Sequence, residues 1–205
     1  MSKKLVIATR NAGKIAEFRR ILDAISQGAV ELVGLDEFEN LVDVEETGAT
    51  FEENALLKAR YTAKMTGLPS ISDDSGLCID ALGGAPGIFS ARWAGAHGND
   101  KANLEKVLED LEIVPDEERG AHFICATALV MPDGREVVKE ERFEGNILRS
   151  PIGDQGFGYD PIFSPLGMEI SSAQMSAEEK DAVSHRGKSL RAIAPHVIEM
   201  LGGLG

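Results

Sequence analysis

Apolar and polar positions along the chain predict a mixed α/β fold. Residues 5–8, Leu-Val-Ile-Ala, form a short apolar run typical of a buried strand, and a polar turn with Asn11 and Gly13 follows at once. Apolar residues then recur at three- and four-residue steps over about residues 13–26, which predicts a helix with one buried face. The chain is therefore expected to open with a strand, a tight turn and a helix.

Further strands and helices are predicted from apolar runs, capping boxes and helical periodicity. The expected strands lie over residues 32–35, 123–131 and 136–143. Three expected helices begin at residues 50, 99 and 176, and a last helix covers residues 190–201. The last helix contains Pro195, which is expected to bend it. Asp73-Asp74-Ser75-Gly76 is expected to be an acidic turn that joins or interrupts strands. No repeat or linker divides the chain, so we expect one domain over residues 1–205.

The composition and charge of the chain indicate which kinds of binding partner are disfavoured. The chain of 205 residues is 43% hydrophobic and carries a formal charge of −13, which disfavours nucleic acid and anionic membranes. A small anion needs only a local basic pocket, so the average charge leaves a phosphate ligand open. No signal-peptide core or membrane-length apolar run occurs, and Cys78 and Cys125 lack metal-ligand spacing. We expect buried thiols and a cytoplasmic protein.

The turn Thr9-Arg10-Asn11-Ala12-Gly13-Lys14 is the first candidate for ligand binding. It stands before the N-terminus of the predicted first helix, where free backbone N–H groups and the helix dipole favour an anion. A P-loop is excluded, because Ala8 replaces the first glycine and Ile15 follows the lysine. An ordinary strand-to-helix turn explains the same residues equally well.

Two pairs of carboxylates are candidates for a magnesium site. Asp73-Asp74 lies between apolar segments, and Glu45-Glu46 lies upstream. Magnesium prefers oxygen ligands and usually takes one or two protein carboxylates, and a carboxylate beside it can serve as a general base. Paired acids are also common on solvated surfaces, which is the simpler explanation for Glu45-Glu46.

Two later segments combine aromatic, acidic and basic groups. Gly156-Phe157-Gly158-Tyr159-Asp160-Pro161 could present an aromatic face to a nucleotide base, although a packed loop with Phe157 in the core is equally consistent. Ser184-His185-Arg186-Gly187 offers hydrogen-bond donors soon after Lys180. Their clustering favours a site over isolated surface residues.

Taken together, these motifs resemble the Ham1-like inosine triphosphate pyrophosphatase family, from Ala8 to about Leu190. The resemblance rests on their common order and spacing. The motifs are Thr9-x-Asn11-x-x-Lys14, Glu45-Glu46-Thr47-Gly48, Phe51-x-Glu53-Asn54-Ala55, Asp73-Asp74-Ser75-Gly76-Leu77, Gly83-Gly84-Ala85-Pro86-Gly87, Gly156-Phe157-Gly158-Tyr159-Asp160-Pro161 and Ser184-His185-Arg186-Gly187.

The resemblance implies an elongated mixed β-sheet flanked by helices, two lobes around a central cleft, a homodimer and Mg2+ as cofactor. It implies hydrolysis of inosine and xanthosine triphosphates between the α- and β-phosphates. The roles that it implies are phosphate binding by Thr9, Arg10, Asn11, Ala12, Gly13 and Lys14, metal binding by Glu45 and Asp74, proton acceptance by Asp74, substrate contact by Ser75 and Lys180, base binding by Phe157, Gly158, Tyr159 and Asp160, and donation to the 6-oxo group by His185 and Arg186.

We expect a magnesium-associated water to attack the α-phosphorus in line, with Lys14, Lys58 and Lys180 stabilising the polyphosphate. Donors aimed at a 6-oxo group would meet the amino group of adenine, which predicts rejection of ATP. Two positions depart from the common pattern of the family: Gln174 replaces a frequent acid, and Arg10 a frequent glycine. One alternative is a Maf-like pyrophosphatase, which a substrate panel separates. The other is a nucleotide sensor, which would bind ITP tightly without hydrolysing it.

Overall fold

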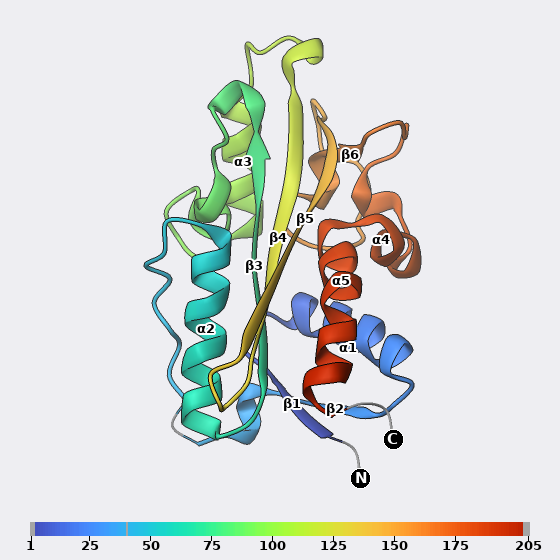
Figure 1. Ribbon diagram of the computed structural model, residues 1–205. Coiled ribbons are helices and arrows are strands. Elements are labelled where there is room, and N and C mark those ends of the chain that lie inside the picture. Colours follow the sequence, from blue (N-terminus) through green and yellow to red (C-terminus); the bar gives the residue numbers. More distant parts are fainter. Residues whose placement is uncertain (1–2, 40, 203–205) are drawn as a thin grey trace. The chain divides into compact units, whose positions relative to one another are not determined.

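The structure is a computed structural model that describes residues 3–39 and 41–202 (Figure 1). The strands are β1 (Lys3–Ile7), β2 (Val30–Val33), β3 (Ser70–Ile79), β4 (Gly120–Val130), β5 (Glu136–Ile147) and β6 (Phe163–Pro165). The α-helices are α1 (Ala12–Ser26), α2 (Phe51–Thr66), α3 (Asp100–Asp110), α4 (Ala177–Val183) and α5 (His185–Met200). The α/β class that the sequence predicts is confirmed.

The strands form one mixed sheet in the order β2-β1-β3-β4-β5-β6. β1 pairs in parallel with β2, where Leu5 faces Leu32, and with β3, where Ile7 faces Ile71. β5 and β6 are antiparallel, with Asn146 opposite Ser164. The parallel pairs thus involve the first three strands, β1, β2 and β3. β4 and β5 are neighbours in the sheet and form the hairpin expected around residues 132–134.

The chain separates into two compact units, which are described one at a time. Unit 1 consists of the described residues of Met1–Asp74, Cys125–Glu141 and Arg186–Gly205. Unit 2 consists of Ser75–Ile124 and Arg142–His185. The divisions fall inside β3, β4 and β5, so these strands contribute residues to both units. The single domain expected from the sequence stays a prediction.

Unit 1 has its core between the sheet and the helices α1 and α5. Phe18 and Leu22 of α1 pack with Ile193 of α5 against Leu5 and Ile71 of β1 and β3. These side chains are almost fully buried, and burial of this kind contributes roughly 1.5–3 kcal/mol for each large apolar side chain. The periodic apolar face over residues 13–26 is thus buried, as predicted, and it packs against the sheet.

Unit 2 has a separate core around α3 and the ends of the long strands. Val107 of α3 and Leu111, the residue that follows this helix, pack in one cluster with Leu77, Phe123 and Phe163. The Phe123 and Phe163 rings have centroids 4.7 Å apart and are tilted by 56°, an ordinary geometry for packed aromatic rings. This core supports the loop that contains residues 156–160.

Local capping explains where two helices begin. At α2, the Thr50 hydroxyl accepts from Glu53 N at 3.1 Å, but the Glu53 carboxylate accepts from Ala49 N rather than closing on Thr50. At α4, Ser176 and Glu179 form the complete capping box. The predicted helix starts are confirmed at both positions.

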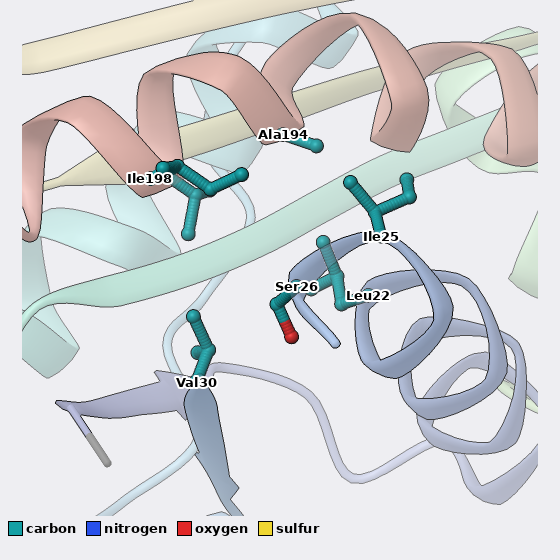
Figure 2. A pocket seen from close by; sticks show the side chains of 7 residues that line it. Leu22, Ile25, Ser26, Val30, Ala194 and Ile198 are labelled. Carbon is teal, nitrogen blue, oxygen red and sulfur yellow. The ribbon is translucent and has the colours of Figure 1, made fainter. Parts of the chain in front are cut away.

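A small apolar pocket lies between the end of α1, β2 and α5 (Figure 2). Its lining residues carry no charge and are Leu22, Ile25, Ser26, Val30, Ala194, Val197 and Ile198. Figure 2 shows the Ser26 hydroxyl among the apolar side chains of Leu22, Val30 and Ile198. The Ser26 oxygen is buried and has no hydrogen-bond partner among the described residues. Such a pocket does not suit a charged nucleotide.

None of the described helices is both long and apolar enough to cross a membrane.

Candidate active site

The turn between β1 and α1 is built around Asn11, which caps the helix. Asn11 has extended backbone angles, and its side-chain oxygen accepts from Lys14 N at 3.1 Å. Thr9 Oγ1 accepts from Asn11 N at 3.2 Å and closes the turn. Arg10 instead points to the next segment, where it donates to Asp43 at 2.7 Å and to the Leu41 carbonyl at 2.8 Å.

Asp73 is a fully buried carboxylate with two cationic partners. Lys14 Nζ lies 3.0 Å from Asp73 Oδ2, and Arg186 donates to the same oxygen from Nε and Nη2, both at 3.1 Å. Burial would raise the pKa of Asp73, but Lys14 and Arg186 hold it well below its usual range. Arg186 also donates to the buried Glu17 on α1, so Asp73 and Glu17 enclose the guanidinium.

Asp74 has different neighbours, supplied by α2. Asn54 Nδ2 donates to Asp74 Oδ2 at 3.1 Å, and Lys58 Nζ lies 3.6 Å from Asp74 Oδ1. Burial raises the pKa of Asp74, and Lys58 offsets only part of this effect. Burial alone would lower the pKa of Lys58, but the surrounding carboxylates outweigh it and raise the pKa. Asp74 is therefore a buried carboxylate whose charge Lys58 compensates only in part.

The two aspartates differ because they are neighbours on a strand. The structure has β3 continuous over Ser70–Ile79, so the prediction of a turn at Asp73-Asp74 is wrong. Successive side chains of a strand point to opposite faces. Asp73 therefore faces α1 and α5 and Asp74 faces α2, and their cationic partners allow both carboxylates to lie within a buried strand.

Of the two upstream glutamates, the structure brings Glu46 to this group. Lys58 Nζ lies 2.6 Å from Glu46 Oε1 and bridges it to Asp74, whereas Glu45 is exposed. Asn54 also accepts from Gly48 N at 2.8 Å, so one buried amide holds both the 45–48 loop and Asp74. Metal binding by Glu45 stays a prediction.

A chain of small polar groups lies behind Asp73. Cys125 Sγ is 3.7 Å from Asp73 Oδ2, and Ser189 Oγ donates to the same sulfur at 3.3 Å. Burial, with the nearby Asp73 charge, raises the pKa of Cys125 to about 12, so its thiol stays protonated. Both Cys78 and Cys125 are buried free thiols, as predicted.

In unit 2, Asp160 of the predicted base-binding segment pairs with Lys180. Asp160 Oδ2 accepts from Lys180 Nζ at 2.6 Å and from Phe157 N at 2.9 Å, and Asp160 and Lys180 are both buried. The Lys180 ammonium also lies 4.8 Å from the centre of the Phe157 ring, which is half-buried. Phe157, Asp160 and Lys180 are thus one cluster.

The other predicted residues of unit 2 have contacts of their own. Tyr159 is buried and its hydroxyl donates to the Ser90 carbonyl at 2.7 Å. His185 is stacked on Phe123, with ring centroids 4.8 Å apart and planes within 10°. Ser75, the first residue of unit 2, follows Asp74 on β3 and is partly exposed.

Each unit therefore brings together part of the predicted set, and each adds residues that the sequence analysis did not single out. Unit 1 gathers Lys14, Lys58, Asp73, Asp74 and Arg186, with Glu17 as an added partner of Arg186. Unit 2 gathers the 156–160 segment with Lys180 and adds Asp100. The sequence pattern could have indicated Glu17, because it is an acid beside Phe18 on the buried side of a helix.

The comparisons with known proteins agree with these motifs. The model of the Ham1 family matches residues 5–196. A dITP/XTP pyrophosphatase of Streptomyces coelicolor is 56% identical over 199 residues, which covers 97% of this chain and 99% of that protein.

Solved structures extend the similarity to the fold. The nucleoside-triphosphatase, or dITP/XTP pyrophosphatase, of Mycobacterium abscessus is 52% identical, with a TM-score of 0.76 over 94% of this chain and 99% of that one. A HAM1 protein of Coxiella burnetii is 41% identical, with a TM-score of 0.85 over 96% and 99% of the two chains. The chain accordingly belongs to the Ham1 family.

Proposed function

We propose that this protein hydrolyses triphosphates of non-standard purine nucleosides, ITP, dITP and XTP, to the monophosphate and pyrophosphate. The reaction removes these nucleotides before polymerases incorporate them into DNA and RNA. The observation that carries the proposal is Asp74, a buried carboxylate with a raised pKa beside Lys58, in a chain whose relatives are dITP/XTP pyrophosphatases. A general base needs a pKa raised toward the working pH.

Unit 1 supplies the groups for the phosphates. In the proposal, Lys14 and the backbone of the 9–14 turn bind the polyphosphate, because the turn presents the N-terminus of α1. Lys58 lies where it stabilises negative charge beside Asp74. Asp74 accepts the proton of the water that attacks the α-phosphorus, and pyrophosphate leaves.

The residues present fit magnesium. Among residues 3–39 and 41–202, no group of three or more His, Cys, Asp and Glu could hold a metal ion. Magnesium, however, commonly uses one or two carboxylates together with phosphate and water. Asp74, with Glu45 or Glu46 from the adjoining loop, would hold it, and additional positive charge beside Asp74 would favour the ionised form that burial disfavours. The bound ion would supply that charge against the polyphosphate.

Unit 2 supplies the groups proposed for the base, except Arg186, which belongs to unit 1. We propose that the base stacks on Phe157, whose position Asp160 and Lys180 hold. Lys180 and Ser75 contact the substrate, and His185 and Arg186 donate to the 6-oxo group.

Donors aimed at the 6-oxo group also explain base selectivity. The amino group of adenine would place a donor against a donor, which costs roughly 1–3 kcal/mol in a buried site. This mismatch favours inosine and xanthosine over adenosine. We further propose that the protein acts in the cytoplasm as a homodimer and needs no nucleic acid or membrane partner.

The experiment that tests this function is magnesium-dependent hydrolysis of ITP, dITP, XTP, GTP, ATP and one pyrimidine triphosphate, with pyrophosphate and orthophosphate measured separately. We expect pyrophosphate from ITP, dITP and XTP and little product from ATP or GTP. Orthophosphate alone would contradict cleavage between the α- and β-phosphates. Tight ITP binding without turnover would indicate a nucleotide sensor.

A further inference from the structure

Residues 156–160 of unit 2, here called the aromatic loop, are tied down from within. Asp160 closes the loop on itself by accepting from Phe157 N, and a Cβ on Gly156 would lie only 2.1 Å from Asp160 Oδ2. Gly156 and Gly158 both have positive φ, 74° and 64°, which side chains other than glycine rarely adopt. These bonds fix the turn, but they do not fix where the turn lies on unit 2.

Two bonds to other segments place the loop. The Tyr159 hydroxyl donates to the Ser90 carbonyl, and Ser90 is held in turn by Leu77 N, which donates to its hydroxyl at 2.9 Å. Gly158, which lies between Phe157 and Tyr159, donates from its backbone N to Asp100 Oδ2 at 3.0 Å. Asp100 is exposed, so this bond adds little to the core of unit 2.

The N-terminus of α3, which carries Asp100, is fixed by hydrogen bonds. It is the first residue of α3, and Asn99 caps that helix by accepting from Ala102 N at 3.2 Å. Asn103, one turn later, donates to the Ala91 carbonyl at 3.2 Å and accepts from Ala94 N at 2.8 Å. The position of the Asp100 carboxylate is therefore determined by helix and loop together.

We propose that Asp100 is a positioning residue for base recognition, because its bond to Gly158 N fixes the aromatic loop and with it the Phe157 ring. Asp100 acts through the loop backbone and does not touch the nucleotide. The inference rests on the proposed stacking of the base on Phe157. It assigns a role in substrate affinity to an exposed carboxylate of a helix that otherwise serves the core.

The test compares Asp100→Ala with Asp100→Asn in the full chain. We expect Asp100→Ala to raise the KM for ITP about tenfold, the effect of losing about 1.4 kcal/mol, with kcat nearly unchanged. Asp100→Asn keeps an oxygen that accepts from Gly158 N, so it should restore the KM to within about threefold of the original. Inhibition by tripolyphosphate, which has no base, should be unchanged in both variants.

Glu105→Gln is the matched control. Glu105 lies on the same helix and pairs with Lys101 at 3.7 Å. Its replacement by Gln changes the net charge by the same amount as Asp100→Asn. Its KM should equal that of the original protein. Emission from Trp93, the single tryptophan, reports that α3 still packs, since its indole donates to Asp110 at 2.8 Å.

Hydrogen exchange at the Gly158 amide supplies a readout independent of catalysis. Faster exchange in Asp100→Ala, together with the rise in KM, supports the inference. An unchanged KM in Asp100→Ala overturns it, provided that Phe157→Ala raises the KM. If Phe157→Ala also leaves the KM unchanged, the proposed base site is wrong and the inference falls with it.

Discussion

Replacement of Arg186 tests the buried ion-pair group of unit 1. The side chain is 2% exposed and lies between Asp73 and Glu17, which are 0% and 5% exposed. Arg186→Met keeps an unbranched side chain but leaves two buried carboxylates without this partner. Asp73 retains Lys14 at 3.0 Å, so its loss of compensation is partial.

The expected magnitude follows from the cost of breaking a buried pair. Removal of one partner typically costs about 3–5 kcal/mol, and because Lys14 remains we expect about 3 kcal/mol at pH 7. With a urea dependence of about 2 kcal/mol per molar, the midpoint of unfolding should fall by about 1.5 M. This loss would consume a large part of the stability of an ordinary domain.

The effect must also depend on pH in one direction. Lys14 and Arg186 depress the pKa of Asp73 in the folded protein, so ionised Asp73 stabilises the fold above its unfolded pKa. That contribution is lost as the pH falls through the folded pKa. The variant depresses this pKa less, so its difference from the original protein should be full at pH 7 and shrink below about pH 4.

Urea unfolding at pH 7 and at pH 4 to 3 measures both expectations. Arg186→Met combined with Glu17→Gln should recover part of the loss, because it removes one of the two uncompensated charges. A loss below about 1 kcal/mol at pH 7 would refute the reasoning, since it lies below the range for a broken buried pair. A difference that does not change with pH would refute the electrostatic explanation.

Three further predictions concern other parts of the molecule. Lys58→Met removes a charge that lowers the pKa of Asp74, so the acid limb of the kcat/KM profile should move to higher pH. Gly156→Ala should raise the KM for ITP but not weaken pyrophosphate inhibition, because its Cβ would meet Asp160 in a backbone conformation with φ of 74°. Ser26→Ala should raise the unfolding free energy by about 1 kcal/mol in a thermal melt, because it removes a buried hydroxyl without a partner among the described residues.

Local patterns made much of the fold predictable. The apolar periodicity over residues 13–26 and the capping box at Ser176 depend on neighbours in sequence, so they locate α1 and α4 directly. The continuous strand through Asp73 and Asp74 could not be predicted in this way. Two adjacent acids favour an exposed turn unless cationic side chains from other elements neutralise them. Here these partners are lysines and an arginine that are distant in the chain, and sequence spacing does not reveal them.

The candidate site shows the same limit. The residue types at Lys14, Asp74 and Lys180 indicated phosphate and metal chemistry, but the pairing of Arg186 with Glu17 joins positions 169 residues apart. Asp100 gave no signal at all, since an acid in the first turn of a helix is common and its bond to Gly158 depends on tertiary structure. Contacts of this range follow from how the elements pack.

The role of Asp74 is the central claim, and pyrophosphate release from ITP by Asp74→Asn tests it most directly. Alongside this rate, ITP binding is measured by calorimetry to show that the variant still holds its substrate. Loss of the general base should lower kcat at least about 100-fold while binding changes little. Release of pyrophosphate at close to the original rate would contradict the account, because Asp74 could then be neither the proton acceptor nor an essential ligand.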